Sequence, residues 1–104
     1  METSLHRTLG ILADDLTSAA DGAAPFVERG ACAWIGRSCL PASGANVLAV
    51  DSGSRSLSEV QAVDAVVKLT GQLASFPIFY KTVDSTLRGH IRSELEASFI
   101  ASGR

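Results

Sequence analysis

The sequence has no run of eighteen apolar residues, and its first residues lack the apolar stretch of a secretory signal. We therefore expect a cytoplasmic protein that does not use a membrane as a partner. Positive charge is not in excess either, because the formal net charge of −2 gives no electrostatic reason to expect nucleic acid. The two cysteines are too few for a disulfide framework and lack the spacing of a zinc site, so no metal site is predicted. Cys32 lies in an apolar stretch and is expected to be a small buried thiol.

The composition is that of a globular protein, with 46% hydrophobic and 19% charged residues. A chain of 104 residues is long enough for one compact domain and too short for two, so residues 1–104 are treated as a single domain. No internal repeat or low-complexity segment is visible. Information on function must therefore come from the order of the elements and from local motifs.

The hydrophobic pattern alternates between short apolar runs and helical periodicity. Strands are predicted at Thr8–Ala13, Ala31–Ile35 and Val47–Val50, with a fourth that starts at Ile78 and reaches Val83. Helices are predicted at Thr17–Arg29, with a break or kink at Pro25 and Gly30 as the terminating glycine, and at Ile91 to about Ile100. Between them, Ser56 and Glu59 form a Ser-x-x-Glu capping box that opens a helix to about Leu69.

This alternation predicts an α/β fold, with a mostly parallel sheet of about four strands and helices on both faces, in a Rossmann-like three-layer arrangement. Parallel strands place all their carboxyl ends at one edge. Ligands in such sheets bind at that edge, where the strand order reverses.

Polar residues gather at the predicted carboxyl ends of three strands. The first strand is followed by Asp14, Asp15 and Thr17, and the third by Asp51, Ser52, Ser54 and Arg55. The fourth leads into Lys81, Asp84, Ser85, Thr86, Arg88 and Gly89. Each group alone could be a set of helix caps or an ordinary turn. Caps do not require a lysine, two arginines and four aspartates together, so the combination indicates a pocket for a small, polar, anionic ligand. Aspartates accept hydrogen bonds from vicinal hydroxyls and arginine binds a carboxylate bidentately, which suits a polyol acid.

Three of these segments resemble a known family. ADDLTSAAD (residues 13–21), DSGSR (residues 51–55) and KTVDSTLRGHIRSELEA (residues 81–97) are similar to signature segments of the four-carbon acid sugar kinases, and they occur in the family's order. The resemblance implies an amino-terminal sugar-binding domain and a carboxy-terminal nucleotide-binding domain. It also implies transfer of the γ-phosphoryl group of ATP to the terminal hydroxyl of a tetronate or 3-oxo-tetronate.

The chain departs from the family pattern in two places and in length. Ser18 and Arg92 stand where glycine is common, and no Gly-rich phosphate-binding segment is present. We therefore expect a truncated sugar-acid-binding domain, with ATP and Mg²⁺ bound only by a nucleotide-binding domain or partner chain that this sequence lacks. Such a chain should bind substrate without turnover.

The resemblance and the residue chemistry together suggest roles. Asp14 and Asp15 would be the catalytic pair, binding substrate hydroxyls, with one of them as general base; the sequence leaves open which. Arg55 and Arg88 would hold the substrate carboxylate. The other predicted substrate-binding residues are Thr17, Asp51, Ser52, Lys81, Asp84, Ser85, Thr86 and Gly89. Among them, Lys81 and Asp84 would complete the polar network.

Other functional classes remain open at this point. A receiver module for signalling would use Asp51 as phospho-acceptor, although Lys81 precedes the hydroxyls of Ser85 and Thr86 instead of following them on a later strand. A haloacid-dehalogenase-type phosphatase needs acids at alternate positions after the first strand, which Asp14-Asp15-Leu16 does not supply. A fragment that only folds is a further alternative. Because an incomplete sheet leaves edges and apolar faces uncovered, self-association or stabilisation by a nucleotide-binding domain is expected.

Overall fold

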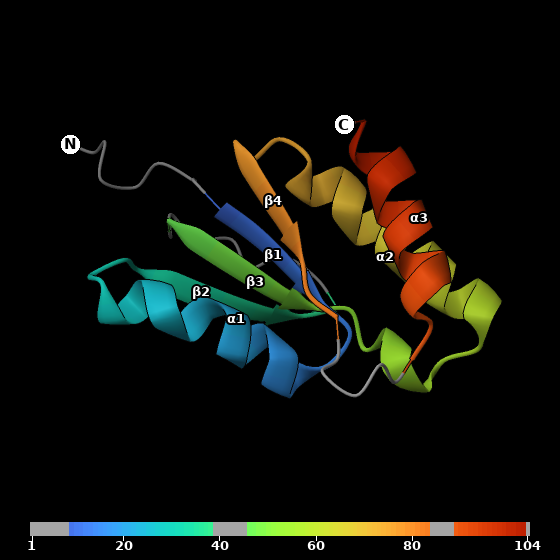
Figure 1. Cartoon of the computed structure of the whole chain (residues 1–104), viewed down its shortest axis with the longest axis horizontal. Helices are drawn as coiled ribbons and strands as arrows, with labels where there is room; N and C mark the ends of the chain where they lie inside the picture. Colours follow the sequence, from blue (N-terminus) through green and yellow to red (C-terminus); the bar gives the residue numbers. More distant parts are fainter. Residues whose placement is uncertain (1–8, 39–45, 84–88, 104) are drawn as a thin grey trace.

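The computed structural model describes residues 9–38, 46–83 and 89–103 (Figure 1). These ranges form, in chain order, β1 (Leu9–Ala13), α1 (Leu16–Glu28), β2 (Ala33–Arg37), β3 (Val47–Asp51), the 3₁₀ turn η2 (Ser54–Ser56), α2 (Glu59–Leu73), β4 (Ile78–Lys81) and α3 (Ile91–Ser102). Every predicted strand and helix is present, although several of their ends differ from the prediction.

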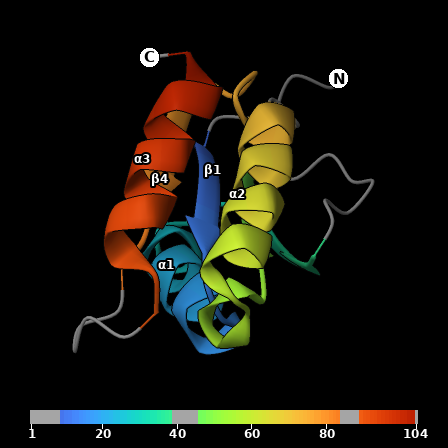
Figure 2. The ribbon, with the colours of Figure 1, turned by 90° about the vertical axis from the view of Figure 1, so that its right-hand side faces the viewer.

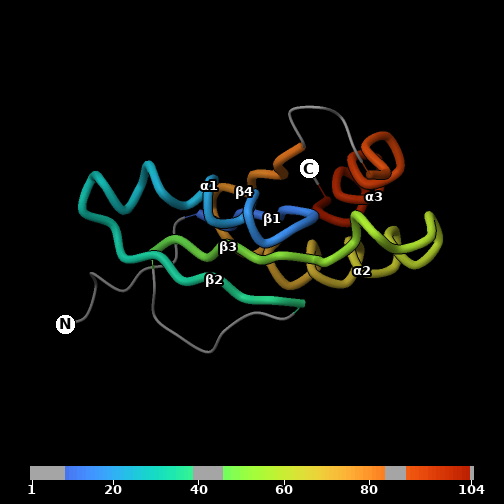
Figure 3. The backbone as a smooth tube through the Cα atoms, turned by 90° about the horizontal axis from the view of Figure 1, so that it is seen from below, coloured from blue at the N-terminus to red at the C-terminus, as the bar shows by residue number. Residues whose placement is uncertain are grey.

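The four strands form one parallel sheet in the order β2-β3-β1-β4, which can be followed in Figure 3. The predicted α/β fold with a parallel sheet is therefore confirmed. In the register of β1 with β3, Leu9 lies opposite Val47 and Ala13 opposite Asp51, so the two strands end together. A receiver module has the order 2-1-3-4-5, with β1 beside β2. Here β1 lies between β3 and β4, which is a different topology.

Helices cover both faces of the sheet (Figure 1). Alternate side chains of a strand point to opposite faces. On one face Leu12, Leu48 and Val50 pack against the buried side of α2 and against Phe76. The other face is covered by α1, whose small residues Ala19 and Ala23 pack against a second cluster that includes Ile11, Ala13 and Ala49. The helix α3 packs mainly on α2, and the two lie side by side in Figure 2.

The ends of α1 follow from local hydrogen bonds. Asp15 is the N-cap, and its carboxylate accepts a hydrogen bond from the Ser18 amide at 2.9 Å. At the other end Gly30 has φ +92°, a conformation that glycine adopts without strain, and its amide donates to the carbonyl of Val27. The helix continues through Pro25 to Glu28, so the predicted break is absent, and the missing N–H costs one hydrogen bond close to the end of the helix.

The predicted start of α2 is wrong. The capping box is made by Ser58 and Gln61, whose side chains each bond the other's backbone N–H, whereas Ser56 belongs to η2. The helix then runs to Leu73, well past the predicted end at Leu69. Its buried stripe consists of Ala62, Val66, Leu69, Thr70 and Leu73, whereas Val60 and Val67 face solvent.

Two further boundaries move for local reasons. β2 begins at Ala33 because the amide of Ala31 closes the end of α1 and the amide of Cys32 bonds the Asn46 side chain at 3.2 Å. Cys32 is exposed, so its expected burial is also wrong. β4 ends at Lys81, short of Val83, although the amide of Thr82 still donates to the carbonyl of Leu12.

Candidate functional site

At the carboxyl end of the sheet, Arg55 meets Asp14 and Asp15, which lie 41 and 40 positions before it in the sequence. Arg55, in the turn after β3, donates from Nε and Nη2 to the two carboxylate oxygens of Asp14 at 3.3 and 3.0 Å. Its Nη1 lies 3.0 Å from Oδ2 of Asp15. Asp14 is only 4% exposed, so this bidentate contact compensates a carboxylate that has lost most of its water. The arginine thus holds both predicted catalytic aspartates in fixed orientations.

A third segment reaches the same place through Gly89. A Cβ built on this residue would lie 2.8 Å from Oδ2 of Asp14, which is closer than a Cβ atom normally approaches a non-bonded atom. Its φ of +86° also favours glycine. Only a residue without a side chain can therefore lie against the Asp14 carboxylate here. The predicted convergence of three distant segments holds for the described part of this edge.

Asp51 and Ser52 connect β3 to β1. The Asp51 carboxylate accepts from the amide of Gly53 at 2.7 Å, which forms a tight turn after the strand. Both the amide and the hydroxyl of Ser52 donate to the carbonyl of Ala13, at 2.8 and 3.0 Å. These contacts hold the start of the Asp14-Asp15 segment against the end of β3.

A buried polar chain continues from Ser52 to α3. Its hydroxyl lies 2.7 Å from that of Ser54, and Ser54 donates to Oε2 of Glu94 at 2.7 Å. Oε1 of Glu94 forms an ion pair with Lys81 Nζ at 3.2 Å, while the hydrogen bond of Lys81 goes to the carbonyl of Thr82. Neither Ser54 nor Glu94 was predicted as a substrate-binding residue, although Ser54 is one of the polar residues after the third predicted strand. The sequence does contain a signal that Glu94 is buried, because its spacing from Ala97 and Ser98 places the three on one face of a helix. All three are buried in the structure.

The remaining predicted site residues make no contact with this cluster that the structure describes. Thr17 is exposed in the first turn of α1, at the same end of the sheet. Asp84, Ser85, Thr86 and Arg88 lie outside the described residues. In the described part of the edge, the guanidinium of Arg55 is already paired with Asp14 and Asp15, so a bound anion would need a further positive group.

The described residues also bear on metal and membrane binding. Among the described residues no cluster of three or more histidine, cysteine, aspartate or glutamate side chains could hold a metal ion. Within the same ranges no helix is long and apolar enough to cross a membrane.

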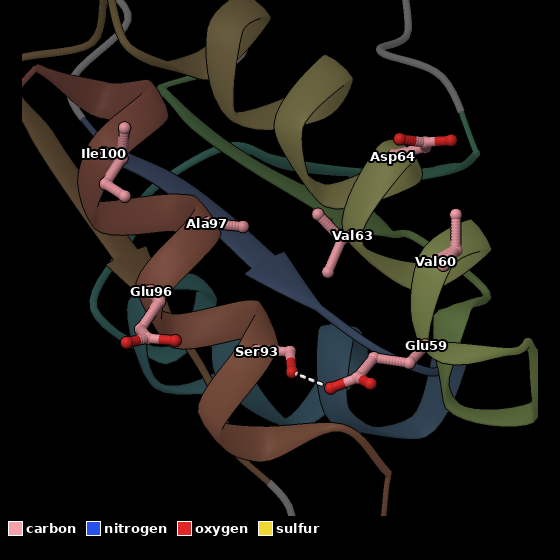
Figure 4. Close-up of a pocket in the computed structure, with 8 residues that line it drawn as sticks. All are labelled: Glu59, Val60, Val63, Asp64, Ser93, Glu96, Ala97 and Ile100. Carbon is pink, nitrogen blue, oxygen red and sulfur yellow. Dashed lines mark hydrogen bonds between the residues drawn. The ribbon is translucent and has the colours of Figure 1, made fainter.

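A separate hollow of about 460 Å³ lies between α2 and α3 (Figure 4). Its apolar lining includes Val60, Val63 and Ile100, and a hydrogen bond from Ser93 to Glu59 crosses one end. None of the predicted site residues lines it, and its acidic residues Glu59, Asp64 and Glu96 would repel an acid. The carboxyl end of the sheet is therefore the better candidate for an anionic polar ligand.

A parallel α/β domain with paired carboxylates at its strand ends belongs to the class of domains that bind small polar ligands at this edge. More particularly, the chain belongs to the family described as the sugar-binding N-terminal domain, which matches residues 9–103. The resemblance to the amino-terminal part of four-carbon acid sugar kinases is thereby confirmed.

Two relatives carry a more specific name. The chain is 32% identical over 99 residues to a D-threonate kinase of Salmonella typhimurium, covering 90% of this chain and 23% of that protein. It is 37% identical, over an alignment of 112 residues, to a D-threonate kinase of Bordetella bronchiseptica, covering 91% of this chain and 26% of that protein. The chain thus spans about a quarter of the length of the curated relatives it matches.

A solved structure has the same fold. It is a crystal structure of a domain of unknown function from Bordetella bronchiseptica, with bound citrate, in the form of a domain-swapped dimer. The TM-score is 0.80 at 36% identity, and the match covers 91% of this chain and 26% of that chain.

Proposed function

We propose that this chain is the substrate-binding part of an ATP-dependent kinase that phosphorylates the terminal hydroxyl of a four-carbon sugar acid. The observation that carries the proposal is the cluster in which Arg55 holds Asp14 and Asp15 while the backbone of Gly89 lies against Asp14. Support also comes from the family description and from the two relatives named D-threonate kinase. D-Threonate and related tetronates are the substrates to test first.

The chain's own residues would bind and orient the acceptor hydroxyls. Each carboxylate oxygen can accept more than one hydrogen bond, so Asp14 and Asp15 can accept from a substrate hydroxyl while they remain bound to Arg55. During transfer one of them would take the proton of the attacking hydroxyl. Arg55 lowers the cost of keeping these carboxylates charged and correctly oriented.

The substrate carboxylate needs a different partner from the one that the described residues supply. Arg55 was predicted for this role together with Arg88, but in this structure its guanidinium faces two aspartates. We assign the carboxylate to Arg88 and to the first amides of α3, whose N-cap His90 makes no side-chain cap hydrogen bond. Asp51, Ser52 and Thr17 would shape the pocket from the opposite side.

ATP would supply the phosphoryl group and Mg²⁺ would neutralise its charge. We propose that a nucleotide-binding domain beyond these 104 residues binds both, since the relatives are about four times as long as the matched region. Under this proposal the chain binds the sugar acid and leaves transfer to the longer protein.

Contact with another domain or another copy is a further part of the proposal. Phe99 and Ile100 of α3 are 66% and 76% exposed, and Ile78 and Tyr80 are exposed on β4, at the edge of the described sheet. The Bordetella domain is itself a domain-swapped dimer. Sedimentation velocity over a range of concentrations should show self-association, and a monomer at every concentration would contradict it.

Titration of the 104-residue chain with D-threonate, followed by ¹H–¹⁵N NMR, tests the binding site. We expect saturable shifts at the amides of Asp14, Asp15, Arg55 and Gly89, and about tenfold weaker binding for Asp14→Asn, which corresponds to about 1.4 kcal/mol. Glu59→Gln, in the hollow between α2 and α3, is the matched control and should bind like the parent. Shifts confined to that hollow, or no saturable shift with any tetronate, would show that the proposal is wrong.

A further inference from the structure

Glu94 is a buried acid that the proposed mechanism does not use. Its residue is 2% exposed, whereas the side chains of Arg92 and Glu96 on the same helix are 90% and 65% exposed. Burying a carboxylate is costly unless it is paired and hydrogen-bonded. The contacts of Glu94 therefore indicate what the side chain does.

These contacts run toward the two sides of the proposed site. Oε2 accepts from Ser54, the residue before Arg55. The Ser54 hydroxyl lies 2.7 Å from the Ser52 hydroxyl, which lies 3.0 Å from the carbonyl of Ala13, the residue before Asp14. Three contacts thus lead from α3 to the residues next to Arg55 and Asp14.

The other carboxylate oxygen connects α3 to the sheet. Oε1 lies 3.2 Å from Lys81 Nζ, at the end of β4, and the lysine side chain is only 8% exposed. α3 otherwise packs mainly on α2. Because Gly89 lies just before α3 and against the Asp14 carboxylate, a displacement of α3 would also displace this contact.

We infer that Glu94 is a positioning residue for the sugar-acid site: it sets where Gly89 and Arg55 lie relative to Asp14, with Lys81 as its counter-ion. The identity of the ligand in this inference rests on the proposed function. The contacts of Glu94 do not depend on it. Glu94 itself does not contact the substrate, since it is buried beneath Ser54 and Lys81. Lys81, which was predicted as a substrate-binding residue, is the counter-ion of Glu94 in this structure.

The first test compares Glu94→Gln with the parent 104-residue chain by NMR titration with D-threonate. The substitution keeps the shape and removes the charge, so we expect about tenfold weaker binding. Glu96→Gln is the matched control, because it removes an exposed carboxylate from the same helix, and it should bind like the parent. Val66→Ala lowers stability through the apolar cluster between α2 and the sheet, away from the polar contacts of Glu94. It should also bind like the parent under conditions where all variants are folded.

The second readout needs no ligand. In Glu94→Gln the backbone amide of Gly89 and the Nε–H signal of Arg55 should shift, while both stay in place in Glu96→Gln and Val66→Ala. If the parent chain binds no tetronate, the proposed function fails, and these two signals still decide the role of Glu94. Should Glu94→Gln not fold, Ser54→Ala breaks the same chain of hydrogen bonds from the other side. Parent-like affinity and unchanged Gly89 and Arg55 signals in the folded variant would overturn the inference.

Discussion

The two ends of the parallel sheet differ in what they bury. At the carboxyl end Asp14, Asp51 and Glu94 are all nearly inaccessible to solvent and have a cation or a hydrogen-bond donor as partner. At the amino end there is a hollow of about 400 Å³ lined largely by apolar residues such as Leu9, Phe26, Val47 and Ile78. The helices α1, α2 and α3 all begin near the carboxyl end, because each follows a strand in the chain. Strand direction thus concentrates positive helix ends and polar side chains at one end only.

The comparison can be tested closely because the two ends contain similar residues. Each has an arginine, Arg55 or Arg29, and each has a glycine with φ near +90°, Gly89 or Gly30. If the carboxyl end is the site, the same substitution should have a larger effect there, and only there should it change ligand binding.

The largest difference is expected for the arginines. Arg55→Met leaves the buried Asp14 carboxylate without its counter-ion, which should cost about 3 kcal/mol of folding stability and abolish detectable D-threonate binding. Arg29→Met removes an exposed cation at the amino end and should change stability by less than about 0.5 kcal/mol. Urea denaturation of both variants measures this. Equal losses of stability would mean that the Asp14–Arg55 pair does not compensate a buried charge.

The glycines should differ less. Gly30→Ala meets no atom within 4 Å and should cost only the strain of its backbone, about 1 kcal/mol, without affecting binding. In Gly89→Ala the same strain is joined by displacement of the Asp14 carboxylate from Arg55, so we expect about 2 kcal/mol and a clear loss of affinity. Thermal denaturation and the NMR titration together check both. A Gly89→Ala chain that binds normally would contradict the packing of Gly89 on Asp14.

The smallest effect on stability is expected for Ser58, a polar residue at the carboxyl end that caps α2 and is not part of the proposed site. Ser58→Ala removes the N-cap of α2 and should cost about 1 kcal/mol, whereas Ser56→Ala should be nearly neutral. Neither should alter affinity for D-threonate. Altered binding in Ser58→Ala would show that stability and ligand binding at this end cannot be separated.

Much of the fold could be predicted from local patterns. The buried apolar runs at Leu9–Ala13 and Val47–Asp51 predict parallel strands, and Gly30 predicts the end of α1. The start of α2 could not be predicted in the same way, because more than one serine could be its N-cap. Ser56 and Ser58 both precede a residue that could complete a capping box, and the turn η2 after β3 decided in favour of Ser58.

The sequence by itself determined that the chain is a parallel α/β domain and that Asp14, Asp15 and Arg55 lie at one end of its sheet, because strand direction and chain order follow from local periodicity. Only the tertiary structure decided which charges are partners. Arg55 was predicted to hold a substrate carboxylate, but it faces Asp14 and Asp15, and Lys81 faces Glu94. The physical reason is that a buried carboxylate must find a cation wherever the packing of distant elements brings one within reach, and no local pattern records that distance.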